Sequence, residues 1–402
     1  MTAVGISEPP GSAPPPRFAL FAYGFRPFFL AAAIHAAVSI LVWLAMLRGW
    51  LPPPSGVVAT LWHAHEMVFG PLAAAMAGFL LTTVPNWTGE ARLHGPRLMA
   101  LFAVWLAGRA AFAWIGALPP ALTAAVDLAF FPALCLAIAP ALLRRSRRRN
   151  GAFVLMPVAM FAANACWHAD AMGLIDAAAT ASRLAIDVVL IVVTVIAGRI
   201  VPAFTQSGLR MAGRAITIRP STALDRLAVA ATALILVVDA MPLDGRAAVA
   251  ILAAACAVHA IRLARWQGHA TLGVPLVWSL HLGYAWLVAG LALRAAAAHG
   301  AVPDLMGVHA LTAGAMGTLI LAVMTRASLG HTGRPLRAGA AETAAYLLVA
   351  IGAALRVASG WPSPAAPALL TAGGVLWALA FAVFAARYAP ILIGPRVDGR
   401  PG

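Results

Sequence analysis

The chain is a succession of apolar segments, each about 20 residues long, separated by short loops. Apolar residues make up 62% of the 402 positions and charged residues only 10%, far below the share in soluble domains. A run of roughly 20 apolar residues is the length of helix that crosses a lipid bilayer. The pattern therefore excludes a soluble fold and predicts an all-α integral membrane protein.

We expect about twelve transmembrane helices. The predicted segments are residues 28–47, 57–84, 98–117, 121–143, 152–175, 181–204, 222–242, 245–265, 272–297, 304–327, 341–360 and 365–393. In this interpretation residues 28–393 form a single polytopic transmembrane domain. A disordered cytoplasmic tail precedes it at 1–27, and a second cytoplasmic tail follows at 394–402.

The arginines predict the orientation of these helices. All 28 basic residues are arginine, and they cluster in alternate loops, for example at 144–149 and 334–337. The intervening loops carry acidic residues such as Asp176 and Asp244. Because loops rich in arginine stay on the cytoplasmic side, we expect both termini there. The net charge of +15 thus belongs to the loops, which favours membrane lipid over nucleic acid as a partner.

The sequence also contains a weak internal repeat. The second, sixth and tenth predicted helices end in related stretches, at 84–89, 201–206 and 324–334, spaced by a little under 120 residues. This spacing predicts a three-fold repeat of four-helix units.

Ionisable residues inside the apolar segments are the candidate functional groups, because each is costly if it faces lipid. Counting at the 1.5 Å rise of a helix places several of them at one depth, about 10 Å from the periplasmic face. They are His63, His65, Glu66, Asp127, His168, Asp187 and His309. Neutral imidazoles from separate helices are ligands that suit iron or copper. The alternative for each histidine is a hydrogen-bonded residue inside a helix bundle.

The second helix carries two of these histidines close together. On a regular helix His63 and His65 point in different directions, whereas His63 shares a face with Glu66, Met67 and Gly70. One histidine can therefore bind a metal while the other faces a second site. Glu66 is the candidate proton donor of this layer, as a carboxyl group buried one turn from His63.

A second candidate pair lies deeper, near the middle of the membrane. His35 and His281 fall there, and Tyr284 follows His281 by one turn on the same face. A histidine with a phenol in reach would supply a metal ligand and a proton donor for reductive chemistry. The alternative is an aromatic packing face that contains a hydrogen-bonded histidine.

Arginines near the cytoplasmic ends of the helices are candidates for binding anions. Arg26, Arg199, Arg326 and His331 stand among turn residues, where side chains and backbone amides suit haem propionates or lipid phosphates. The alternative is that these arginines only set the orientation of the helices.

Several stretches together resemble the NnrS family of bacterial membrane proteins. The most specific are Trp62-His63-Ala64-His65-Glu66-Met67 and Leu329-Gly330-His331-Thr332-Gly333-Arg334, with further similarity at 25–30 and 198–202. The resemblance covers nearly the whole chain. It implies a twelve-helix protein of the bacterial cytoplasmic membrane that contains haem, of type b, and copper, and that is linked to denitrification and nitric oxide.

Taken together, the sequence leads to a functional hypothesis with two alternatives. We expect a protein that binds, detoxifies or reduces nitric oxide under nitrosative stress, with Glu66 and Tyr284 as catalytic candidates if it is a nitric oxide oxidoreductase. Its electron donor is not specified by the sequence. The alternatives are a transporter of metal or haem, and a haem-based sensor of nitric oxide without catalysis.

Overall fold

The structure, a computed structural model, describes residues 18–400 apart from 215, 220 and 242, and omits the side chains of 145–149. This range is helical throughout, with no strand in it, so the predicted all-α membrane fold is confirmed. Most of the tail predicted as disordered, residues 1–17, lies outside the described residues. Residues 18–24 form turns, and the first helix begins at Phe25.

Nineteen helical elements are described. They are α1 (Phe25–Leu47), α2 (Ala59–Met67), η1 (Val68–Leu72), α3 (Ala73–Thr88), α4 (Gly95–Ala113), α5 (Pro120–Leu128), α6 (Phe130–Leu142), η2 (Arg145–Val154), α7 (Leu155–Ala171), α8 (Ala178–Met211), α9 (Thr222–Ala240), α10 (Gly245–Arg265), η3 (Gly268–Thr271), α11 (Pro275–Ala298), α12 (Asp304–His309), η4 (Ala310–Met316), α13 (Gly317–His331), α14 (Ala340–Ala358) and α15 (Ala366–Ile393).

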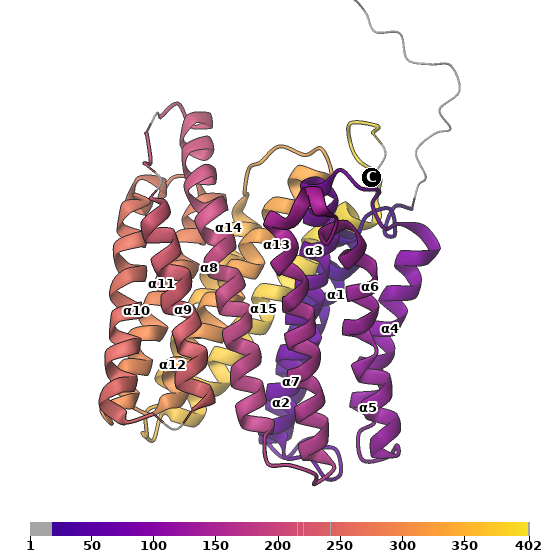
Figure 1. The fold of residues 1–402 in the computed structure, drawn as a ribbon, viewed down its shortest axis with the longest axis vertical. Coiled ribbons are helices and arrows are strands. Elements are labelled where there is room, and N and C mark those ends of the chain that lie inside the picture. The colour runs from indigo at the N-terminus through magenta and orange to yellow at the C-terminus, as the bar shows by residue number, and fades with distance from the viewer. Residues whose placement is uncertain (1–17, 215, 220, 242, 401–402) are drawn as a thin grey trace, which may run out of the picture.

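Eleven continuous helical segments in this range are long and apolar enough to cross a membrane. The predicted helix 222–242 is present as α9, which is apolar apart from three charged residues, Asp225, Arg226 and Asp239. Both described ends of the chain lie at the same end of the bundle (Figure 1), where the Ala19 amide donates to the Ile393 carbonyl at 2.7 Å. This placement requires an even number of crossings, which α9 completes.

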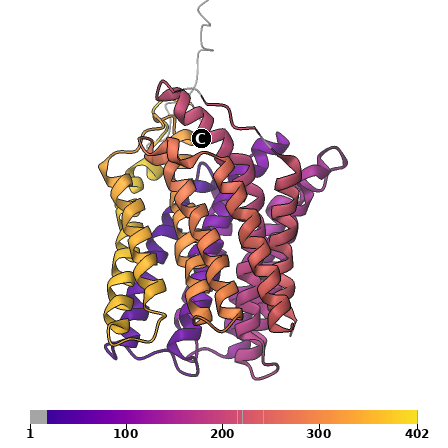
Figure 2. The ribbon, with the colours of Figure 1, turned by 90° about the vertical axis from the view of Figure 1, so that its left-hand side faces the viewer.

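Two long spans form the centre of the bundle. The span α2–η1–α3 is the most buried, with 78% of its apolar window inside the protein, and α12–η4–α13 follows with 61%. Helices α1 and α11 pack against these spans, and the hairpin α14–α15 packs against α1 and η4. The helices stand nearly parallel to one another (Figure 2). These two spans are therefore the ones whose side chains are most often in the interior.

Both central spans are interrupted by a π-helical segment directly after their histidines. Segment η1 contains Pro71, which has no amide hydrogen to donate, and η4 follows His309. Single π turns inside α-helices are frequent at functional sites. The sixth span, α8, is an uninterrupted α-helix of 34 residues, so only the second and tenth spans share this feature. The three-fold repeat stays a prediction.

The arrangement predicts the outcome of a topology experiment. Reporter fusions after residues 150 and 214 and at the C-terminus should all report the cytoplasm, and fusions after 176 and 244 the opposite side, because arginine-rich loops stay cytoplasmic. If α9 does not cross the membrane, the fusions after 214 and 244 will report the same side.

Candidate cofactor cavity and buried polar network

A cavity of about 400 Å³ lies inside the bundle, among α1, α2, α8, α12, α14 and α15 and both π segments. Most of its wall is aliphatic or aromatic, with Trp43 among the aromatic residues. The ionisable side chains on the wall are His63, His309, Arg183 and Arg356. Two of the predicted histidines, from helices more than 200 residues apart, therefore face one shared space.

The imidazole of His309 is oriented by a backbone hydrogen bond. Its Nδ1 lies 2.9 Å from the carbonyl oxygen of Leu305, one turn earlier on α12. A carbonyl can only accept, so Nδ1 carries the hydrogen and Nε2 keeps a free lone pair. Histidines that bind metals are typically held in this way, with the second ring nitrogen donating to a carbonyl or carboxylate.

His63 is held by an aromatic stack. Its ring lies on Trp43 of α1, with ring centroids 4.0 Å apart and planes 18° from parallel. The Nδ1 atom of His63 is buried and has no hydrogen-bond partner among the described residues. A buried polar atom without a partner is costly unless a ligand satisfies it.

Helix α2 has two functional faces, as the directions of His63 and His65 predict. His63 and Met67 line the cavity, whereas His65 and Glu66 point into a buried polar network on the other side. The expectation that Glu66 and Gly70 share the face of His63 is wrong. Glu66 points into the network, and the π turn at η1 changes the direction of Gly70. Gly70 instead contacts His35, whose ring leaves no room for a side chain there.

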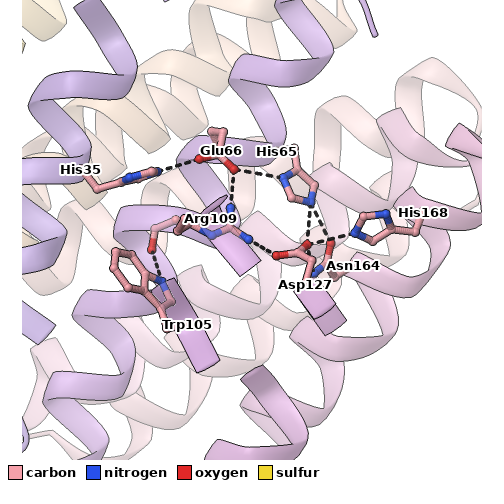
Figure 3. A network of polar contacts seen from close by, with 9 residues as sticks. His35, His65, Glu66, Trp105, Arg109, Asp127, Asn164 and His168 are labelled. Atoms are coloured by element: carbon pink, nitrogen blue, oxygen red, sulfur yellow. Dashed lines mark hydrogen bonds and ion pairs between the residues drawn. The ribbon is translucent and has the colours of Figure 1, made fainter. Parts of the chain in front are cut away.

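The polar network joins α1, α2, α4, α5 and α7 (Figure 3). Arg109 of α4 is at its centre and donates to the carboxylates of both Glu66 and Asp127. His35 contacts Glu66 through Nε2 at 2.7 Å. On the other side, Asp127 Oδ2 lies 2.9 Å from His168 Nε2 and 3.2 Å from His65 Nε2. Four of these side chains were predicted for the periplasmic-half layer, and they meet.

The network contains a donor set that could hold a metal ion. His65, Asp127 and His168 each offer one ligand atom, and these atoms lie within 4.8 Å of one another. All three side chains are buried. Two carboxylates face a single guanidinium here, so one further positive charge, on an imidazole or a bound cation, balances the cluster.

Glu66 does not have the isolated environment expected of a proton donor. Arg109 and His35 both bind its carboxylate, and His65 Nδ1 lies 3.5 Å away. Glu66 also does not line the cavity. Its catalytic role stays a prediction without support from its position.

The predicted deep pair, His35 and His281, lies in two different environments. His35 belongs to the network around Glu66, whereas His281 Nε2 contacts Thr205 Oγ1 at 2.8 Å. The hydroxyl of Tyr284 does not contact His281 in the structure. It lies 2.6 Å from Nδ1 of His259, a histidine that the sequence interpretation did not include.

The remaining candidates lie away from the cavity wall. Asp187 is buried beside Asp239, whose carboxylate accepts from Arg294 at 2.7 Å. Arg26 donates to the carbonyls of Leu392 and Gly394, at 2.8 and 2.7 Å. It thereby joins α1 to the end of α15.

The other predicted anion-binding residues contact aromatic rings. Arg199 lies over Trp87, and Arg326 lies over Phe204 with 3.9 Å from its guanidinium carbon to the ring centroid. The ring of His331 is 5.6 Å from that of Tyr23. None of these side chains lines the cavity, so their binding of a cofactor stays a prediction.

Sequence reasoning missed four charged or amide side chains of these sites: Arg109, Asn164, Arg183 and Arg356. Arg109 and Asn164 lie inside apolar segments. This position could have identified them as candidates, because polar groups at that depth are rare. Asn164 donates to Asp127 at 2.9 Å and accepts from His65. Arg356 stands two residues before the end of α14, where an arginine is easily taken for a loop charge.

The network predicts a large loss of stability when its central charge is removed. Arg109→Gln should lower the free energy of unfolding by about 3–5 kcal/mol, because it leaves two buried carboxylates without the guanidinium that compensates their charge. Arg144→Gln is the control, since it breaks an exposed pair with Glu90 and should cost about 0–1 kcal/mol. Denaturant titration of both variants in detergent measures the difference, and equal losses would contradict it.

Comparison with known proteins identifies the family of this chain. Residues 19–396, nearly the whole sequence, match the protein family described as NnrS protein. No curated protein matches the chain. The two motifs on which the resemblance rests lie in the central spans, and His63, His65 and Glu66 of the first motif supply groups to both sites above. The chain, a multi-pass helical membrane protein, therefore belongs to the NnrS family.

Proposed function

We propose that this protein binds haem in the cavity between α2 and α12, and that it handles nitric oxide there within the bacterial cytoplasmic membrane. The observation that carries the proposal is the pair of imidazoles, His63 and His309, on the wall of one largely apolar cavity. Imidazole is the common protein ligand of haem iron, and an apolar pocket suits the porphyrin.

The residues present fit such a group. His309 presents a lone pair on Nε2, and the buried Nδ1 of His63 is without a partner in the described structure. Trp43 and Trp377 supply flat apolar surfaces on the wall. Haem, when bound, supplies reversible binding of small gases and a change of iron oxidation state. The protein orients the two imidazoles and keeps water from the cavity.

Access for nitric oxide is supported by a second, smaller cavity. It has a volume of about 110 Å³ and an apolar wall formed by α1, η1, α3, α7, α8 and α13. Leu72 and Ile320 line both cavities and separate them. An uncharged diatomic gas dissolves in lipid and would meet no charged side chain on the wall of this smaller cavity.

Copper is proposed for the donor set of His65, Asp127 and His168. Imidazole nitrogens suit copper, and the three donor atoms already lie close together. Arg109 and Asn164 would support the site from outside by binding Asp127. Helix α2 would then separate the two cofactors, with His63 on one side and His65 on the other.

Binding of nitric oxide is the activity that this cavity supports without further groups. Reductive turnover needs a proton donor beside the bound gas. Neither Glu66 nor Tyr284 lines the cavity. A nitric oxide oxidoreductase that uses these two residues is therefore a proposal carried by the sequence alone.

The haem proposal predicts a loss of haem when either imidazole is removed. His63→Ala and His309→Ala should each weaken haem binding by more than about 10-fold, while His299→Ala, at an exposed position after α11, should retain it. Absorption spectra of the purified proteins measure haem content, and addition of nitric oxide should shift the wild-type spectrum. A wild-type protein that never takes up haem would favour the metal transporter instead.

The copper proposal predicts a separate effect on metal content. His168→Ala should lower bound copper by more than about 10-fold without loss of haem, because it removes one ligand of the network and none of the cavity. His281→Ala is the matched control, since His281 contacts Thr205 outside both sites. Elemental analysis of the purified proteins measures this. Unchanged copper in His168→Ala would mean that the network is structural.

A further inference from the structure

Arg356 is a buried arginine without an acidic partner. Its side chain lies on the cavity wall with His63 and His309, and it is 9% exposed. Its Nη1 donates to Ser359 Oγ at 3.0 Å, and its Nε has no hydrogen-bond partner within residues 18–400. A guanidinium cannot release its proton in a protein, so the charge is permanent.

Three other arginines of the bundle interior or the cavity wall have carboxylate partners. Arg109 binds Glu66 and Asp127, and Arg294 binds Asp239. The second arginine of the same cavity, Arg183, lies 2.6 Å from Asp304. Among the described ion pairs, none includes Arg356. An uncompensated buried charge is strongly unfavourable, so whatever fills the cavity should bring an anionic group.

The cavity specifies what carries this anion. Its wall combines two imidazoles and a single unpaired guanidinium with aromatic side chains, including Trp377 and Phe381. A small free anion would leave the large apolar volume unfilled. A ligand with a flat apolar body and a carboxylate at its edge matches all parts of the wall.

We propose that Arg356 binds a propionate carboxylate of haem and that Ser359 positions its guanidinium for this contact. The inference rests on the proposed haem site and adds the residue that binds the carboxylate edge of the haem. Ser359 accepts from Arg356 Nη1 and donates to the Arg356 carbonyl at 2.7 Å, which fixes the hydroxyl in place. Guanidinium and carboxylate form charge-assisted hydrogen bonds in paired geometry.

Haem and its dimethyl ester distinguish this contact from the rest of the site. The ester keeps the porphyrin and the iron but removes the charge of both carboxylates. Full-length protein produced without haem is titrated in detergent with each compound, and affinity is read from the absorption spectrum. Wild-type protein should prefer haem to the ester by about 10- to 100-fold, the range of a hydrogen bond to a charged group.

The variants assign the preference to one arginine. Arg356→Gln should bind haem about 10- to 100-fold more weakly than wild type, with little change for the ester, so that the preference disappears. Arg356→Lys should retain part of the preference, because it keeps a positive charge without the paired geometry. Arg48→Gln is the control and should keep the full preference, since Arg48 donates to Thr371 and does not line the cavity.

The possible outcomes separate this inference from the haem proposal. If wild-type protein binds haem and the ester equally, or if Arg356→Gln keeps the preference, the role of Arg356 is overturned while the haem site stands. If wild-type protein binds neither compound, the haem site fails and the inference fails with it. The wild-type comparison decides the matter even if Arg356→Gln does not fold.

Discussion

The first half of the bundle depends on the ion pairs that the guanidinium of Arg109 forms. Inside a membrane no water compensates a buried charge, so the carboxylates of Glu66 and Asp127 need this positive group beside them. Because the three residues come from α4, α2 and α5, their ion pairs also fix the packing of those helices. His168 extends the contact to α7 through Asp127. The same residues thus stabilise the fold and form the proposed copper site.

The helices and the depth of their polar residues could be predicted from the sequence, because both depend on properties of single segments. Apolar length identifies a span, and the constant rise per residue gives depth. His65, Asp127 and His168 accordingly meet in one layer. Direction around the helix axis depends on neighbouring helices, which the sequence does not show. For this reason Tyr284 was expected beside His281, whereas its hydroxyl contacts His259.

The arginines illustrate the same limit. The chain has 28 basic residues, all arginine, and most of them occupy loops, where they indicate orientation. Arg356 falls inside the predicted segment 341–360, but the sequence does not show whether its side chain faces lipid, a loop or a cavity. Only the packing of α14 against α12, α15 and η4 places its side chain on the cavity wall. Arg26, one of the anion-binding candidates, joins the start of α1 to the end of α15.

The π turn at η1 has a consequence for how this family tolerates changes in length. A π turn contains one residue more than an α-helical turn, so it offsets the faces before and after it by about 100°. Deleting a single residue between Val68 and Leu72 would restore a regular helix without removing any functional group. It would nevertheless turn α3 relative to His63 and His65, exchanging lipid-facing for interior positions along the helix. In this segment the number of residues matters as much as the identity of their side chains, because the number sets which residues of α3 face the interior.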